Sequence, residues 1–222
     1  MSAATQDETA TDFAVERNAW AECRVTREPI APLRDGEVLF RIDRFALTAN
    51  NVTYALTGDM LGYWRFFPAP DPWGRIPVMG FADVARSAHP GVAVGERVFG
   101  FFPMSTHLRI EAGEVHAASF LDVAAHRRDT APAYRQYTRC AQDRLYAPAD
   151  EDALMLLRGL FLTSFLVDDF IAEHAGFDAG SFVLSSASSK TAIALAYLLS
   201  RRARGRVVGL TSARNAEFVE GL

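Results

Sequence analysis

A serine-rich turn near the end of the sequence carries the residue types that bind phosphate. The turn reads Ser186, Ala187, Ser188, Ser189, Lys190 and Thr191. An alanine- and leucine-rich stretch typical of a helix follows over residues 193–202. The first turn of a helix has unpaired backbone N–H groups that favour an anion, and Lys190 adds a point charge suited to phosphate. We therefore predict that these turn residues contact the pyrophosphate of a nucleotide cofactor.

The segments on both sides of this turn are the ones that must position it. Residues 181–185 and 206–211 are apolar runs typical of buried strands, and the helix lies between them. Strand, tight turn, helix and strand in this order are the layout of a mononucleotide-binding βαβ unit. A doubly wound domain needs two βαβαβ halves, yet the sequence ends at Leu222. We therefore expect an incomplete Rossmann domain in a C-terminally truncated chain.

The turn departs from the glycine pattern of dinucleotide sites. The slots of G-x-G-x-x-G/A hold Ala187, Ser189 and Ala192, so a side chain stands where phosphate comes closest. An alternative is a serine-rich turn that only caps the helix. The end of the turn also resembles a P-loop, but Leu184 and Ser189 occupy the glycine slots of that motif. We therefore reject a P-loop NTPase.

The residues after the second strand indicate which cofactor is preferred. An NAD site places an acid at the end of that strand, whereas an NADP site has an Arg nearby. The first acid is Glu217, while Ser212 and Arg214 are placed to bind a 2′-phosphate. The alternative is that Arg214 is a solvated loop residue. We predict NADP(H) as the cofactor, with Ser212 and Arg214 as contacts.

Composition is that of a soluble globular enzyme. The 222 residues are 50% hydrophobic and 23% charged, with a formal net charge of −4. A negative net charge does not indicate the basic surface that nucleic-acid-binding proteins use. The two cysteines, Cys23 and Cys140, have no partner spacing, and we expect them to be reduced.

Targeting and membrane segments are not evident in the sequence. Its first ten residues are polar and acidic, unlike a signal peptide. The longest apolar stretch, residues 153–171, is interrupted by Arg158 and by Asp168 and Asp169. It falls short of the roughly 20 apolar residues needed to cross a bilayer. We expect a cytoplasmic protein with no membrane partner.

The sequence before the nucleotide turn predicts a β-rich domain. Alternating or apolar runs predict strands at 36–43 (continuing over 45–49), 78–85 and 96–102. A short helix over 52–56 ends at Gly58, and an aromatic, proline-rich loop follows over 62–77. Tyr63, Trp64 and Trp73 of this loop could line a pocket for a flat substrate, or could be loop packing. Apolar spacing over 154–173 predicts a linking helix.

Several of these features together resemble a known family. They are Asn50 before the short helix ending in Gly58, Pro77-Val-Met-Gly80, Val94-Gly-Glu-Arg-Val-Phe-Gly100 and Gly159-Leu-Phe-Leu-Thr-Ser164. Their order is similar to that of medium-chain dehydrogenases/reductases, and most like the zinc-independent quinone oxidoreductase and enoyl reductase branch. The resemblance covers about residues 20–222. It implies an α/β chain in which a GroES-like, β-rich partial barrel carries the substrate site and the first βαβ unit of the Rossmann domain follows. The nicotinamide would lie in the cleft between the two domains. The implied domains are a flexible tail over 1–20, a substrate domain over 21–150, and a linking helix with a partial dinucleotide-binding domain over 151–222.

The sequence departs from the zinc-dependent members of that family. Their Cys slot holds Ala49, and their Gly-His-Glu slots hold Gly80, Phe81 and Ala82. Zinc sites need N, S or O ligands from the protein, which these side chains do not offer. The five histidines, at 89, 107, 116, 126 and 174, show no metal-ligand spacing. We predict that the chain binds no metal.

The resemblance also implies candidate catalytic residues. Asn50 or Asn51 is where zinc-independent relatives keep an Asn near the nicotinamide and the substrate. Tyr54 lies one helical turn after Asn50, so it can share that face and donate a proton. The alternative is that the asparagines cap the helix and Tyr54 is only packed.

The function expected from these observations is an NADPH-dependent, zinc-independent reduction of a small molecule by hydride transfer. The substrate class is a quinone, or an activated C=C or carbonyl compound. Alternatives are an inactive binding relative and a non-functional fragment of a longer reductase. We expect residues 181–222 to be the least stable part of the chain and to promote self-association, and a homo-oligomer stays open.

Overall fold

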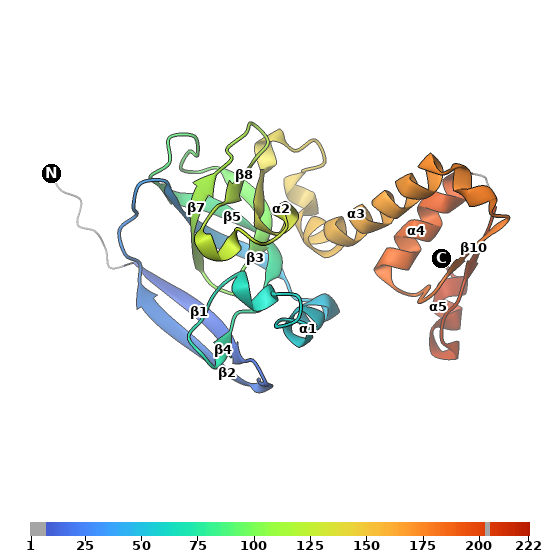
Figure 1. Cartoon of the computed structure of the whole chain (residues 1–222), viewed down its shortest axis with the longest axis horizontal. Coiled ribbons are helices and arrows are strands. Elements are labelled where there is room, and N and C mark those ends of the chain that lie inside the picture. Colours follow the sequence, from blue (N-terminus) through green and yellow to red (C-terminus); the bar gives the residue numbers. More distant parts are fainter. Residues whose placement is uncertain (1–7, 203–204) are drawn as a thin grey trace. The chain divides into compact units, whose positions relative to one another are not determined.

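The computed structural model describes residues 8–202 and 205–222 of the chain. The chain divides into two compact units, Met1–Met155 and Leu156–Leu222, which are described separately below. Unit 1 is rich in β-strands, and unit 2 combines helices with a parallel strand pair (Figure 1). The predicted α/β fold class, a β-rich barrel followed by a βαβ unit, is confirmed.

A closed barrel forms the body of unit 1. Its strands follow the order β3-β5-β6-β9-β8-β7 around the barrel, and each neighbouring pair is antiparallel. The strands are β3 (Glu37–Ala46), β5 (Val78–Ser87), β6 (Arg97–Phe102), β7 (His107–Gly113), β8 (Ser119–Asp122) and β9 (Gln136–Arg139). The last three were not predicted from the sequence, and they are what closes the barrel.

The barrel is filled by large apolar and aromatic side chains. In β3, Val38, Phe40 and Ile42 belong to the barrel core. The opposite face is buried at Leu39 and becomes exposed at Arg41 and Asp43. Over residues 40–43 the alternation is the period-two pattern of a strand with one buried face. The Phe40 ring meets the Phe102, Phe120 and Tyr137 rings with centroids 4.8–6.1 Å apart. Aromatic packing of this kind holds the barrel strands together.

A second sheet corrects the prediction for the start of the chain. Residues 9–20, assigned above to a flexible tail, belong instead to β1 (Thr9–Glu16) and β2 (Ala19–Pro29), while residues 1–7 of that tail lie outside the described residues. The sheet has the order β2-β1-β4, where β4 is Trp73–Gly74. The physical reason is burial, because Ala14 and Val15 of β1 are each 4% exposed and Val15 packs against Trp64.

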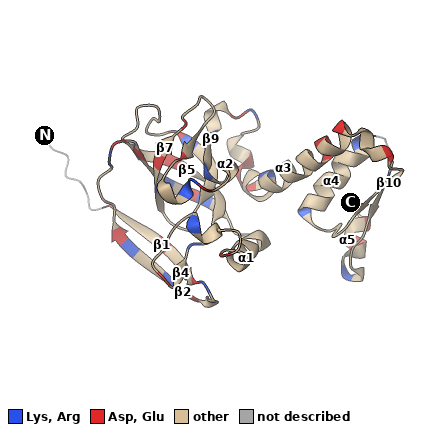
Figure 2. Cartoon of the chain, in the orientation of Figure 1, with Lys and Arg blue, Asp and Glu red and all other residues tan. Residues whose placement is uncertain are grey.

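Short helices complete unit 1. They are α1 (Ala49–Leu56), η1 (Tyr63–Arg65), η2 (Ala125–Arg127), α2 (Pro132–Arg135), η3 (Cys140–Gln142) and η4 (Pro148–Asp150). Helix α1 starts at residue 49 and so includes both candidate asparagines, whereas the predicted helix began at residue 52. Basic and acidic side chains are interspersed over the unit (Figure 2).

Unit 2 contains the predicted βαβ arrangement. Strand β10 (Ser181–Leu184) leads through the serine-rich turn to α4 (Lys190–Arg201) and then to β11 (Arg206–Gly209). The two strands are parallel, with Ser181 opposite Arg206. Helix α3 (Glu151–Glu173) precedes them and spans the boundary between the units, and η5 (Ala175–Asp178), η6 (Ala213–Asn215) and α5 (Ala216–Glu220) are shorter.

Unit 2 leaves many apolar side chains at its surface. Val183 of β10 is 60% exposed and Phe218 of α5 is 55% exposed. Among the described helices, none is both long enough and apolar enough to span a membrane.

Candidate functional site

The serine-rich turn of unit 2, residues 186–191, is called here the phosphate turn. Its sharp bend is made at Ser186, whose φ of 52° lies in the left-handed region. Ala187, the residue in the first glycine slot, is not among the residues with positive φ, so an alanine is tolerated there. Ser189 caps α4, because its side chain accepts a hydrogen bond from the Ala192 N–H at 3.2 Å.

The phosphate turn presents free backbone donors. Within the described part of the chain, the N–H groups of Ser188, Lys190 and Thr191 have no backbone or side-chain acceptor. Those of Lys190 and Thr191 belong to the first turn of α4 and therefore have no partner inside the helix. Ser189 and Lys190 are exposed to solvent, and Thr191 is half-buried. The donors and the positive end of the helix dipole together suit a phosphate group.

Two residues that the sequence analysis missed hold the phosphate turn against the end of β11. The Asn215 side-chain amide donates to Ser188 Oγ at 3.0 Å, and Thr211 Oγ1 lies 3.4 Å from the same oxygen. The Ala187 N–H also donates to the Leu210 carbonyl oxygen at 3.0 Å. Ser188 is thus a structural link as well as a candidate contact. Thr211, the polar last residue of the predicted run 206–211, was the available sequence signal.

The predicted 2′-phosphate contacts lie after β11. Ser212 precedes η6, and its carbonyl oxygen accepts a hydrogen bond from the Asn215 N–H at 2.9 Å. Both Ser212 and Arg214 are exposed. Among the described residues neither side chain makes a hydrogen bond or ion pair, so both can reach a ligand. Their role as cofactor contacts stays a prediction.

Gly209 gives a first test of this geometry. A Cβ added to Gly209 would lie 2.8 Å from the Ala187 Cβ, and Ala187 is only 8% exposed. We expect Gly209→Ala to destabilise the phosphate turn by about 1–3 kcal/mol, the usual range for overpacking. Hydrogen exchange of residues 181–189 measures this. The double variant Ala187→Gly/Gly209→Ala should recover most of the loss, and no recovery would mean that the two Cβ positions do not compete.

In unit 1, the adjacent candidate asparagines have different environments. Asn51 is 4% exposed, and both ends of its amide are used: Oδ1 accepts from the Thr48 N–H at 2.6 Å, and Nδ2 donates to the Pro77 carbonyl oxygen at 2.8 Å. The bond with Thr48 is one half of a capping box, in which the Thr48 side chain accepts from the backbone of the first turn, and it fixes the start of α1. Asn51 therefore has a structural role at the start of α1, and its catalytic role stays a prediction. The side chain of Asn50 makes no hydrogen bond within the described residues and stays a candidate.

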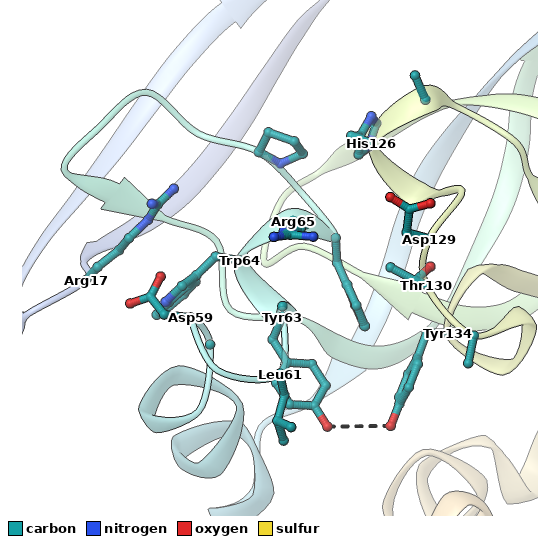
Figure 3. Close-up of a pocket in the computed structure, with 16 residues that line it drawn as sticks. Arg17, Asp59, Leu61, Tyr63, Trp64, Arg65, His126, Asp129, Thr130 and Tyr134 are labelled. Carbon is teal, nitrogen blue, oxygen red and sulfur yellow. Dashed lines mark hydrogen bonds between the residues drawn. The ribbon is translucent and has the colours of Figure 1, made fainter.

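Tyr54 belongs to an aromatic group with two other tyrosines. Its ring lies 4.7 Å from the Tyr63 ring, and the Tyr63 hydroxyl lies 3.5 Å from the Tyr134 hydroxyl (Figure 3). Burial, followed by the nearby Tyr134, raises the pKa of Tyr54. Burial and then the hydrogen bond with Tyr134 raise the pKa of Tyr63 further. The phenols of Tyr54 and Tyr63 therefore remain protonated at neutral pH and can act as donors.

A cavity of about 640 Å³ opens beside Tyr63 and Tyr134. Its lining comes from the segment after α1 and from the loop that contains η2 (Figure 3). Trp64, Arg65, Phe66, His126, Asp129 and Thr130 contribute to it with the two tyrosines. Trp73, predicted above to share this pocket, is not among the lining residues and instead lies under the Arg24 guanidinium. The cavity is in the size range of small-molecule sites, and its aromatic walls suit a flat ligand.

The slots that hold zinc in related dehydrogenases are filled by apolar side chains. Phe81 and Ala82 are completely buried in β5, and the Phe81 ring packs 5.0 Å from the Phe99 ring. In the described ranges, His, Cys, Asp and Glu form no group of three or more that could hold a metal. These residues do not fit a catalytic zinc, and the absence of bound metal stays a prediction.

Comparison with protein families gives one match. The family model described as "Protein of unknown function (DUF2855)" matches residues 45–222. Comparison with curated protein sequences gives no match.

Solved structures show the same fold. The human synaptic vesicle membrane protein VAT-1 homolog-like protein matches at a TM-score of 0.54 with 16% identity, over 96% of this chain and 60% of that one. CurA in complex with NADPH from Vibrio vulnificus matches at 0.53 with 13% identity, over 95% and 54%. A quinone oxidoreductase from Pseudomonas syringae pv. tomato DC3000 matches at 0.50 with 16% identity, over 96% and 56%. The chain therefore spans less than two thirds of the length of these structures.

Proposed function

The chain belongs to the DUF2855 family of proteins of unknown function, and from this starting point we propose that it is a reductase that uses NADPH. The proposed reaction is hydride transfer to a quinone, or to an activated C=C or carbonyl compound. The observation that carries the proposal is the phosphate turn. It presents free backbone N–H groups and Lys190 in the connection that leads from β10 through α4 to the parallel strand β11. The fold shared with CurA, which was solved with NADPH, supports it.

The residues of unit 2 fit a dinucleotide. The N–H groups of Ser188, Lys190 and Thr191 would hold the pyrophosphate, and the Lys190 side chain would neutralise part of its charge. Ser212 and Arg214 would hold the 2′-phosphate, since no acid directly follows β11 to bind a 2′-hydroxyl. NADPH, when bound, would supply the hydride.

The residues of unit 1 fit the substrate. A flat acceptor would lie in the aromatic cavity, and the protonated phenol of Tyr63 would donate to the oxygen that gains negative charge. Tyr134 lies within hydrogen-bond distance of Tyr63 and lines the cavity, so it would pass a proton from solvent to the Tyr63 phenolate. Tyr54 packs against the Tyr63 ring and would hold that phenol in place, while the half-buried Asn50 stays a candidate contact. A zinc ion is not required, because phenolic hydroxyls supply the electrophilic assistance.

Cofactor binding tests the proposal directly. NADPH should bind more tightly than NADH, because a charge-assisted Arg–phosphate contact contributes about 1.5–3 kcal/mol. Replacing Arg214 with alanine should therefore lower the ratio of NADPH affinity to NADH affinity roughly tenfold or more. Titration of the unmutated protein and of the variant, followed by nicotinamide fluorescence, measures both affinities.

Arg206→Ala is the matched control, because Arg206 is also exposed in unit 2 but lies at the opposite end of β11. It should leave the preference unchanged. Equal affinity of the unmutated protein for NADPH and NADH would contradict the assignment of Arg214. NADPH binding without consumption of NADPH in the presence of 1,4-naphthoquinone would favour the inactive binding relative.

A further inference from the structure

Arg127 is a buried arginine behind the aromatic cavity. It ends η2 and is 0% exposed, which is unusual because charged side chains are seldom fully buried. Its guanidinium carbon lies 5.1 Å from the centroid of the Phe66 ring and 4.9 Å from that of Phe67. Arg127 itself is not part of the cavity surface, although its neighbours Ala125, His126 and Asp129 are.

The guanidinium joins two segments that line the cavity. Its Nη1 donates to the Phe66 carbonyl oxygen at 3.2 Å, and its Nη2 donates to the Tyr134 carbonyl oxygen. Phe66 lies three residues after Tyr63, so the two carbonyls belong to the segments that carry the paired phenols. A third segment, the η2 loop, is held by the Arg127 carbonyl, which accepts from the Thr130 N–H at 3.0 Å and from Thr130 Oγ1 at 2.7 Å. Thr130 lines the cavity as well.

The charge of Arg127 is balanced by one buried acid. Asp122 is 2% exposed, and its Oδ2 lies 3.7 Å from Arg127 Nη1. The other carboxylate oxygen accepts from the Ala124 N–H at 3.0 Å. A buried pair of this kind is expensive to desolvate, and an apolar pair of similar volume is often as stable. Stability alone therefore does not explain an arginine at this position. The planar guanidinium group does, because its separate N–H groups can bond two carbonyl oxygens at once.

We propose that Arg127 is a positioning residue that fixes Tyr134 opposite Tyr63 and so sets the shape of the substrate cavity. The inference that this cavity binds substrate rests on the proposed function. The hydrogen bonds by which Arg127 joins the two cavity walls, residues 61–68 and 128–135, do not depend on it. The guanidinium touches neither phenol and acts through the backbone of their segments. A lysine would keep the charge but could not bond both carbonyls in the same geometry.

The test uses Arg127→Met/Asp122→Asn, which removes both charges and leaves neither one unpaired. Hydrogen exchange of the full chain should become roughly tenfold faster in residues 61–68 and 128–135, the change expected when local opening becomes about 1.4 kcal/mol easier. Exchange in β3 should stay the same. Unchanged exchange in both walls, or equal acceleration in β3, would overturn the proposal.

A binding measurement connects the link to the site. Quenching of tryptophan fluorescence by 1,4-naphthoquinone should report an affinity about tenfold lower in the double variant and in Arg127→Lys, with NADPH affinity unchanged. Faster wall exchange with unchanged naphthoquinone affinity would overturn the positioning role. If the unmutated protein binds neither naphthoquinone nor NADPH, the proposed function fails, and hydrogen exchange still decides whether Arg127 joins the walls.

Discussion

Replacing Arg97 with methionine is expected to lower the stability of unit 1 by about 3–5 kcal/mol, the usual loss when one member of a buried ion pair is removed. Arg97 bonds both carboxylate oxygens of Glu151, and its Nη2 lies 2.7 Å from Glu151 Oε2. It also donates to Asp83 at 2.9 Å and to Asp43 at 2.7 Å. Because Glu151 is 3% exposed and starts α3, the variant leaves a buried charge at the end of the barrel.

The loss should depend on pH. The hydrogen bonds from Arg97 are the main cause that holds the pKa of Glu151 below its ordinary value of 4.5. A lowered pKa in the folded state stabilises the protein above the unfolded pKa, and this contribution disappears as the pH falls through the folded pKa. The difference between the unmutated protein and Arg97→Met should therefore be largest near neutral pH and shrink below about pH 4.5.

Urea unfolding of unit 1, followed by circular dichroism between pH 3 and pH 7, measures this difference. Arg41→Met is the control, because Arg41 is exposed and its contact with Asp83 is 3.5 Å long. Arg41→Met should lower the free energy of unfolding by less than about 1 kcal/mol at any pH. A pH-independent loss in Arg97→Met would show that packing of the Arg97 side chain against the Phe81 ring, rather than its ion pair with Glu151, is responsible.

Local patterns in the sequence predicted the βαβ arrangement of unit 2 well. The strand, turn, helix and second strand follow one another along the sequence, and the structure has β10, α4 and β11 in that order. The start of α4 was placed three residues late, because Ser189 at the cap was interpreted as part of the turn. The sequence also left Arg214 as the one basic residue directly after the second strand, and its role stays a prediction.

Long-range pairing explains most of what was missed in unit 1. Strands β8 and β9 are short, and β9 closes the barrel by pairing with β6, whose residues lie about 40 positions earlier in the sequence. The alternation of Thr11, Phe13 and Val15 with smaller or polar residues was a usable strand signal, but the polar start of the chain favoured a tail. At the candidate site, two adjacent asparagines cannot be distinguished by type. Only the capping geometry shows that Asn51 faces inward and Asn50 does not.

The residues that join the walls of the cavity could not be predicted for a similar reason. Tyr134 and Arg127 lie more than sixty residues after Tyr63. Their segments have no regular spacing of apolar residues that would indicate a buried face. Their roles arise from a hydrogen bond between hydroxyls and from carbonyl contacts across the cavity. Such contacts depend on the closed barrel, which brings the segments together.

Adding one methyl group at Gly58 should disrupt the same cavity from the other side. Trp64, which lines the cavity and is 4% exposed, lies in a slot between two glycines. A Cβ at Gly58 would fall 2.3 Å from the indole nitrogen, and one at Gly74 would fall 2.6 Å from the far edge of the ring. The indole cannot move away from one glycine without approaching the other. We therefore expect Gly58→Ala to cost about 3 kcal/mol or more, at the upper end of overpacking losses.

Urea unfolding monitored by circular dichroism measures the loss, and the emission maximum of Trp64 should shift to longer wavelength as the indole becomes exposed. A smaller side chain in the slot provides the matched control. Gly58→Ala should cost much less in a Trp64→Leu background than in the unmutated chain, because the added Cβ then has room. An equal loss in both backgrounds would mean that Gly58 is required by the backbone after α1 and that the slot does not hold Trp64 in place.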